Sequence, residues 1–395
     1  MSLPYIASEN VIDRIKKLDY PYPVYNTTLH NIELLTIIKN SEHTTIQPIT
    51  NYATLTHIKR PSKKLGFAVI DLNELKLCNE FTARYTLSER VKSKRHDVEL
   101  SPYEYWQRDK DRIIKLGLDE VNGIAKKYAR GDEYLDVVEQ CADILYRTGM
   151  PSSFQSNLVV RVLTHFGIKP NQRMLDISAG WGDRLIACCA MGIHYTACDP
   201  NTKLAPLYEK IITELKSEMN INTELNVHTV PFEDWQPDPK EFNTYDVLFT
   251  SPPFFNLEIY CDEPTQSINR HKTVYQWVNN FMKPSLFKTS QLLKTGGLAI
   301  LHLSDVINFK DRSKSLYFVD EIITYCVDVL KWTYLGEMAY GIRDTNKVEI
   351  TQEELDEKRN RERFIKRTVF KDFKDGLRIN QRGQYLAQLL WCFRK

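Results

Sequence analysis

The chain has 395 residues, of which 42% are hydrophobic and 26% charged, and its formal net charge at pH 7 is +2. This is ordinary globular composition with room for two domains or one enlarged α/β domain. A net charge of +2 excludes a protein that is strongly basic overall, so any basic surface that binds nucleic acid must be confined to one part of the chain.

Targeting and redox features indicate an intracellular protein. The first residues lack the basic-then-apolar pattern of a signal peptide, and no stretch approaches about 18 apolar residues. The eight cysteines form no CxxC pair and no zinc-ligand spacing, and several lie in apolar runs. We therefore expect buried free thiols, a cytoplasmic location, no membrane contact and no metal site.

Residues 1–150 carry few chemical signals, and we expect them to form an accessory or substrate-recognition region. A strand is predicted at 66–72, and helical patterns begin near 101 and 135. A cluster of basic residues near 90–96 fits either a solvated loop or contacts to phosphates, and both interpretations stay open.

At Pro151 the pattern changes, and the expected second domain spans 151–395. A predicted helix precedes a short strand, a glycine turn and another helix. Glycines let the backbone pass close beneath a ligand, and the N-terminus of the following helix presents N–H groups to it. The candidate cofactor-binding residues of this DxSxGxG turn are Asp176, Ser178, Ala179, Gly180 and Gly182.

The next predicted strand ends on Asp199, which follows Gly182 by 17 residues. An acidic residue at this position can accept hydrogen bonds from both ribose hydroxyls of a nucleoside. A dinucleotide-binding turn would have a third glycine where Leu185 stands, and the carboxylates of Asp176 and Asp183 would repel a pyrophosphate. A cationic nucleoside without phosphates, S-adenosylmethionine, fits better, although a glycine turn in another kind of α/β protein stays open.

A third predicted strand leads into Phe232, Glu233 and Asp234. The acidic pair can accept the exocyclic amine of an adenine, and Phe232 can meet the adenine face or supply its backbone N–H. An ordinary capped loop would show the same residues, so the two interpretations stay open at this point.

The run Ser251-Pro252-Pro253-Phe254 follows a predicted buried strand. Two prolines cannot continue a strand, because neither has an N–H to donate to the sheet. A hydroxyl, rigid carbonyls and an aromatic ring can together hold a flat ring that bears an amine. We interpret these four residues as catalytic and Phe255 as substrate-binding; a proline turn with a core phenylalanine is the simpler alternative.

The remaining segments frame this run. The polar and aromatic stretch 256–275 is expected to be a substrate lid. We interpret His302, inside an apolar predicted strand, as a core residue and not as a catalytic base.

An insertion at about 343–384 is rich in basic residues, and the segment 358–395 holds 12 Lys or Arg against 3 Asp or Glu. Basic residues interleaved with aromatic ones suit phosphate contacts with base stacking, whereas a solvated helix is the alternative. The substrate-binding candidates here are Lys358, Arg361, Arg363, Lys366 and Arg367.

Together, the glycine turn, Asp199, the acidic pair and the SPPF run resemble the class I S-adenosylmethionine-dependent methyltransferases. Within them, SPPF is similar to the (D/N/S)PP(Y/F/W) signature of enzymes that methylate exocyclic amino groups, most of all to DNA methyltransferases encoded by phages and viruses. The resemblance implies a Rossmann-like, mostly parallel, seven-stranded sheet with an N-terminal α+β extension. It also implies S-adenosylmethionine as cofactor and a nucleic-acid substrate, DNA before RNA.

Two departures from the usual signature leave the target base open. By analogy with the family, serine at the first position favours cytosine-N4, whereas phenylalanine at the last favours RNA guanine-N2 or cap-adenosine-N6 enzymes. Adenine-N6 and cytosine-N4 of DNA are the leading candidates. A catalytically silent nucleic-acid-binding subunit and a protein-glutamine methyltransferase are the alternatives.

Overall fold

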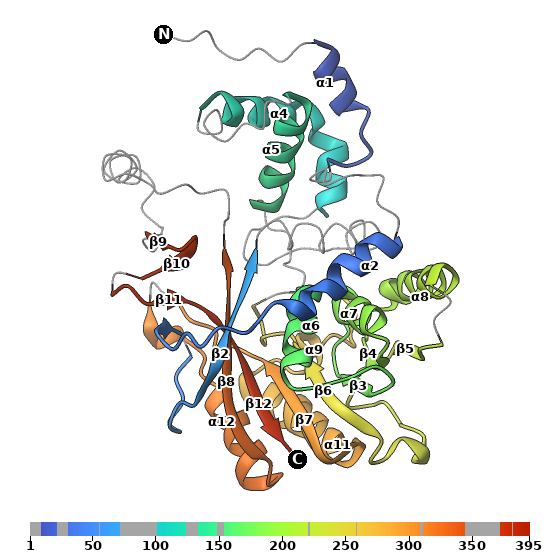
Figure 1. Cartoon of the computed structure of the whole chain (residues 1–395), viewed down its shortest axis with the longest axis vertical. Coiled ribbons are helices and arrows are strands. Elements are labelled where there is room, and N and C mark those ends of the chain that lie inside the picture. Colours follow the sequence, from blue (N-terminus) through green and yellow to red (C-terminus); the bar gives the residue numbers. More distant parts are fainter. Residues whose placement is uncertain are drawn as a thin grey trace.

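The structure is a computed structural model that describes residues 9–21, 31–54, 56–71, 101–123, 133–147, 154–219, 222–257, 259–308, 311–343, 372–380 and 382–395. Figure 1 shows a central sheet with helices on both of its faces and a group of helices beyond one end of it.

The central sheet has eight strands in the order β2-β8-β12-β7-β6-β3-β4-β5. Their bounds are β2 Lys64–Asp71, β3 Arg173–Asp176, β4 His194–Cys198, β5 Leu225–His228, β6 Tyr245–Thr250, β7 Leu293–His302, β8 Thr333–Arg343 and β12 Gln388–Arg394. Only β12 is antiparallel to its neighbours. The predicted α/β fold with a mostly parallel sheet is confirmed, with one strand more than the expected seven.

The carboxyl ends of β3, β4, β5, β6 and β7 lie at the same edge of the sheet, because these strands are parallel. The chain runs outward from β3 through β4 to β5, then returns to the middle and runs the other way through β6 and β7. The strand order therefore reverses between β3 and β6, and in such sheets ligands bind outside the carboxyl ends of the strands at this reversal. The glycine turn follows β3 and the SPPF run follows β6, so both lie at this edge.

Two apolar cores pack on the two faces of the sheet, because the buried strands alternate their side chains between them. In β6, Val247 and Phe249 belong to one core and Leu248 to the other. The first core contains side chains of α2 (Asn31–Asn40), α6 (Ser156–His165), α7 (Asp183–Met191) and α8 (Ala205–Met219). The second contains side chains of the π-helical η6 (Trp277–Met282), α11 (Lys283–Leu292) and α12 (Val319–Thr324).

The N-terminal 150 residues contribute to three different cores. The predicted strand near 66–72 is observed as β2, which pairs in parallel with β8 and adds the eighth strand to the sheet. Helix α2 packs on α7. Helices α1 (Glu9–Lys16), α4 (Pro102–Gly123) and α5 (Glu133–Arg147) instead form a core of their own around Trp106. The sheet domain therefore extends N-terminally past residue 151.

The remaining elements are short. A second sheet has the order β1-β11-β10-β9, with bounds β1 Tyr52–Ala53, β9 Asp372–Lys374, β10 Leu377–Ile379 and β11 Tyr385–Leu386. The other helical segments are η1 Ser41–His43, η4 Thr202–Leu204, η5 Pro239–Glu241, α9 Ser267–Arg270, α10 Val274–Gln276, η7 Arg312–Lys314 and η8 Tyr325–Val329.

The seven cysteines in the described part of the chain are buried and free, as the sequence predicted. Within the same residues, no helix is both long and apolar enough to cross a membrane.

Candidate active site at the carboxyl edge of the sheet

The glycine turn between β3 and α7 has the backbone conformation that only glycine adopts readily. Gly180 has φ +63° and Gly182 has φ +90°. The N–H of Ala179 donates to the carbonyl of Cys198 at 2.9 Å, and the N–H of Ser178 donates to Oδ1 of Asp176 at 3.1 Å. The turn is thereby held against the end of β4.

Asp176 supports this turn from inside the protein. Its Oδ2 accepts from Nε of Arg184 at 2.6 Å and from the hydroxyl of Tyr195 at 2.8 Å. The Asp176 side chain is 0% exposed. The expected contact between Asp176 and a cofactor is therefore corrected to an indirect role, since its carboxylate faces the core and its oxygens have protein donors.

Asp199 lies directly beside the glycine turn. One carboxylate oxygen accepts from the N–H of Gly180 at 2.9 Å, and the other accepts from the N–H of Asn201 at 3.0 Å. Burial raises the pKa of Asp199 to about 6, although both hydrogen bonds oppose the shift. Each oxygen keeps a second acceptor position, so the carboxyl can still accept hydroxyl donors.

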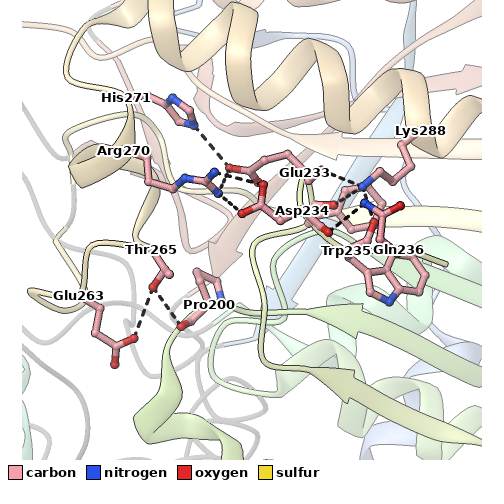
Figure 2. Close-up of polar contacts among 11 residues, drawn as sticks. Pro200, Glu233, Asp234, Trp235, Gln236, Glu263, Thr265, Arg270, His271 and Lys288 are labelled. Carbon is pink, nitrogen blue, oxygen red and sulfur yellow. Dashed lines mark hydrogen bonds and ion pairs between the residues drawn. The ribbon is translucent and has the colours of Figure 1, made fainter.

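Glu233 and Asp234 follow β5 and are engaged by α9. Arg270 donates to Oε1 of Glu233 and to Oδ1 of Asp234, at 2.8 and 3.1 Å, as Figure 2 shows. Oε1 of Glu233 also lies 3.4 Å from Nε2 of His271. Oε2 of Glu233 is buried and has no hydrogen-bond partner within the described residues. One acceptor of the acidic pair thus remains for a ligand.

Phe232 is a core residue under this turn. Its ring is 1% exposed, and Nζ of Lys288 lies 5.4 Å from the ring centroid. The same ammonium donates to the carbonyl of Phe232 at 2.8 Å. It also donates to the carbonyls of Glu233 and Trp235, at 2.9 and 2.6 Å (Figure 2). The predicted contact between this ring and an adenine face is therefore wrong; of the two predicted roles only the backbone N–H remains.

Within the stretch 256–275, predicted to be a substrate lid, residues 259–271 contact the loops that carry the residues proposed for cofactor binding. Glu263 accepts from the N–H and hydroxyl of Thr202. The hydroxyl of Thr265 donates to the carbonyl of Pro200 at 3.4 Å (Figure 2). Tyr260 packs edge-on against Trp181 of the glycine turn. We name residues 259–271 the strap, because they connect the loops that follow β3, β4 and β5.

The SPPF run leaves β6 with its polar groups arranged in a tight turn. The N–H of Phe255 donates to the carbonyl of Pro253 at 2.8 Å, and the N–H of Leu257 donates to that of Phe254 at 3.1 Å. In the part of the chain that the structure describes, no backbone N–H donates to the carbonyl of Pro252. This carbonyl therefore remains an acceptor for a substrate.

The two phenylalanines face different environments. Phe254 is half-buried, and its ring centroid lies 5.2 Å from that of His302. Phe255 is 5% exposed, has φ +53° and packs against Trp277 in the second core. The predicted substrate contact of Phe255 is therefore corrected to a packing role.

His302 is the residue whose role the sequence did not reveal. It is 8% exposed, as a core residue should be, yet its Nδ1 lies 2.8 Å from Oγ of Ser251. The contact arises because β6 and β7 pair in parallel, with Thr250 opposite Leu301. The signal in the sequence was a polar residue at the end of each strand, with Ser251 directly after β6 and His302 as the last residue of β7.

The predicted nucleic-acid contacts Lys358, Arg361, Arg363, Lys366 and Arg367 lie outside the described residues. Among the residues that are described, no group of three or more His, Cys, Asp or Glu side chains could hold a metal ion.

Comparisons with known proteins give remote structural similarity only. No protein-family model matches the sequence, and no curated protein matches it. A geranyl diphosphate methyltransferase solved with SAM is 12% identical, with a TM-score of 0.37 over 67% of this chain and 92% of that one. A putative sarcosine dimethylglycine methyltransferase from Galdieria sulphuraria is 14% identical, with a TM-score of 0.34 over 65% and 88%. TehB from Haemophilus influenzae is 12% identical, with a TM-score of 0.33 over 64% and 66%. At these identities and TM-scores, we infer nothing about the chemistry of this chain from them.

Proposed function

We propose that this protein is an S-adenosylmethionine-dependent methyltransferase that acts on an exocyclic amino group of a nucleic-acid base, with DNA adenine-N6 or cytosine-N4 as the favoured target. One observation carries the proposal. The glycine turn with Asp199 and the Ser251-Pro252 acceptors follow β3, β4 and β6, whose ends meet at the reversal of strand order. The residues proposed to bind the nucleoside of the cofactor thus lie next to those proposed to bind the amine of the substrate.

The residues at this edge fit S-adenosylmethionine. Nδ2 of Asn201 and Oε2 of Glu233 are buried without hydrogen-bond partners in the described chain. Buried polar groups without a partner cost free energy, so a ligand that supplies a donor and an acceptor there is favoured. Asp199 would accept the ribose hydroxyls, Glu233 would accept the adenine amine, and the positive φ of Gly180 and Gly182 lets the backbone approach the ligand.

The chain's own groups would orient the reacting amine. When bound, the cofactor supplies an electrophilic methyl group. Oγ of Ser251 and the carbonyl of Pro252 would accept the two amine protons and so direct the nitrogen lone pair toward that methyl. Phe254 would stack on the base, which in duplex nucleic acid must first leave its helix. The 12 basic residues between 358 and 395 support a polyanionic substrate.

The test is methyl transfer by the full-length protein from labelled S-adenosylmethionine to separate DNA and RNA pools, with nucleoside mass spectrometry of the products. We expect N6-methyladenine or N4-methylcytosine in DNA. Ser251→Ala should lower the rate, whereas Ser217→Ala, at an exposed serine on α8, should not. Methylation of RNA alone would establish the RNA alternative, adenosine-N6 or guanine-N2. Transfer to a glutamine peptide and to neither nucleic acid would contradict the proposal.

A specific observation also supports the alternative of a catalytically silent nucleic-acid-binding subunit. Arg270 already engages both Glu233 and Asp234, which are the acids proposed to receive the adenine. Calorimetry with S-adenosylmethionine separates the two functions. Binding at micromolar cofactor supports the enzyme, whereas no binding at millimolar cofactor supports the silent subunit.

A further inference from the structure

His302 lies at the end of β7 inside a closed aromatic environment. The ring centroids of Phe154, Phe254 and Tyr340 lie 5.3, 5.2 and 5.8 Å from that of His302. Such a site keeps water from the imidazole, so its two nitrogens must be satisfied by protein groups. Oγ of Ser251 contacts Nδ1, and Gln388 and Tyr340 contact Nε2.

The contacts at Nε2 determine which nitrogen carries the proton. Oε1 of Gln388 lies 3.1 Å from Nε2 and can only accept. The Tyr340 hydroxyl, 3.2 Å from Nε2, donates its own proton to the same Oε1. Nε2 therefore carries the proton of the neutral imidazole, and Nδ1 is left with a lone pair.

This tautomer fixes the direction of the hydrogen bond at Ser251. With a lone pair on Nδ1 and a distance of 2.8 Å, the serine hydroxyl donates to the histidine. Oγ then presents only lone pairs to anything on its other side. A free serine hydroxyl could instead donate to the amine nitrogen and occupy the lone pair that must attack the methyl group.

We propose that His302 is a positioning residue that holds Ser251 as a hydrogen-bond acceptor and, through Ser251, receives the proton that the amine loses. This inference rests on the proposed function. As the bond from nitrogen to the methyl carbon forms, the bond from that carbon to sulfur breaks and its electron pair stays on sulfur. The nitrogen proton passes to Oγ of Ser251 while the hydroxyl proton passes to Nδ1, which gives an imidazolium; after the product leaves, the proton returns from Nδ1 to Ser251, which gives its own proton to solvent.

The surroundings of His302 suit such a weak base. Burial lowers the pKa of His302 to about 4, the hydrogen bond to Gln388 opposes the shift, and the positive charge of Arg184 adds to it. The imidazole therefore stays neutral above about pH 5. A protonated exocyclic amine of a base is a much stronger acid than imidazolium, so even this weak base can take its proton. The other groups that face the ring are Ser251 and the Tyr340 hydroxyl, whose pKa is raised by burial.

Variants at position 302 separate positioning from packing. His302→Leu fills the aromatic site but removes the acceptor, whereas His302→Asn can return an oxygen near the position of Nδ1. We expect His302→Leu to lower kcat by about 100-fold, with the cofactor dissociation constant unchanged within about twofold. The kcat of His302→Asn should be about tenfold higher than that of His302→Leu. The wild type should lose kcat as pH falls toward 4, and His302→Asn should not show this loss. His165→Asn, at an exposed histidine on α6, is the control.

Nitrogen-15 NMR of labelled histidine tests the tautomer without any assay of activity. We expect a proton on Nε2, a pKa below 5, and a change in the Nδ1 shift in Ser251→Ala. A proton on Nδ1, or kcat within twofold of wild type in His302→Leu, would overturn the inference while leaving the proposed function intact. Absence of methyl transfer by the wild type would instead overturn the proposed function, and the proton role of His302 with it.

Discussion

Nε of Arg184 lies 2.6 Å from Oδ2 of Asp176, and the two side chains are 3% and 0% exposed. This buried ion pair joins the end of β3 to the first turn of α7, and the glycine turn lies between them. Arg184 also donates to the carbonyl of Ser178 inside the turn. The pair thus holds the loop that is proposed to bind the cofactor.

Replacing one partner of this ion pair should lower the free energy of unfolding more than replacing both partners. Arg184→Met leaves Asp176 charged and buried, and we expect the free energy of unfolding to fall by about 3–5 kcal/mol. In Asp176→Asn/Arg184→Met the uncompensated charge is gone, so the loss should be smaller than in Arg184→Met. Urea unfolding of the wild type, the two single variants and the double variant, which form a double-mutant cycle, measures these losses. A loss below about 1 kcal/mol in Arg184→Met would contradict the structural role.

Truncation of the two adjacent phenylalanines should affect different properties, stability at Phe255 and activity at Phe254. Phe255→Ala opens a cavity in the second core and should lower the free energy of unfolding by about 3–5 kcal/mol. Phe254→Ala should instead lower kcat/KM by about 5- to 150-fold, because the lost stacking is worth about 1–3 kcal/mol. Urea unfolding and steady-state kinetics of both variants test this. Full activity of Phe254→Ala on its substrate would refute the stacking role.

Cofactor affinity should depend on the protonation of Asp199. Its pKa of about 6 means that the carboxyl is protonated below that pH and must lose the proton to accept two hydroxyls. We expect the dissociation constant for S-adenosylmethionine to rise about tenfold from pH 7.5 to pH 5. Asp199→Asn should bind weakly at both pH values, with no such dependence. Calorimetry at the two pH values is the measurement.

Stability should fall in acid because of His302. Its pKa is about 4 in the folded protein and about 6.5 when unfolded, so between these values the unfolded chain binds more protons. This contribution is present above pH 6.5 and is lost as pH falls toward 4. The free energy of unfolding of the wild type should therefore fall, relative to that of His302→Asn, by about 2 kcal/mol from pH 7 to pH 5. Asp199 acts in the opposite direction below pH 6, since its folded pKa is raised, but it is common to both proteins and cancels in the comparison.

The strap should be held down by Arg270. Its guanidinium is 28% exposed and pairs with both Glu233 and Asp234, so Arg270→Ala should loosen the strap by about 1 kcal/mol, or about fivefold in local opening. Amide hydrogen exchange of residues 259–271 measures this opening. Lys283→Ala, which removes a comparable ion pair with Glu321, is the control and should leave the strap unchanged. Equal exchange in the two variants would show that Arg270 does not hold it.

Features encoded in short stretches could be predicted from the sequence. The strand, glycine turn and helix around Gly180 depend on neighbouring residues, and so does the acid at the end of the following strand. The strand near 66–72 was predicted for the same reason, and it is observed as β2. Its place beside β8 was not predicted, because pairing with a strand more than 260 residues away leaves no local pattern.

The α/β fold and the order of the motifs follow from the sequence, because apolar periodicity and glycine positions act within a few residues. Which side chains meet depends on the tertiary structure. The register of β6 against β7 brings Ser251 to His302, and the strap brings Arg270 to Glu233. The direction of each side chain decided the rest, since Asp176, Phe232 and Phe255 face the cores while Phe254 stays half-exposed. Burial and long-range register depend on the whole chain, so no single motif could reveal them.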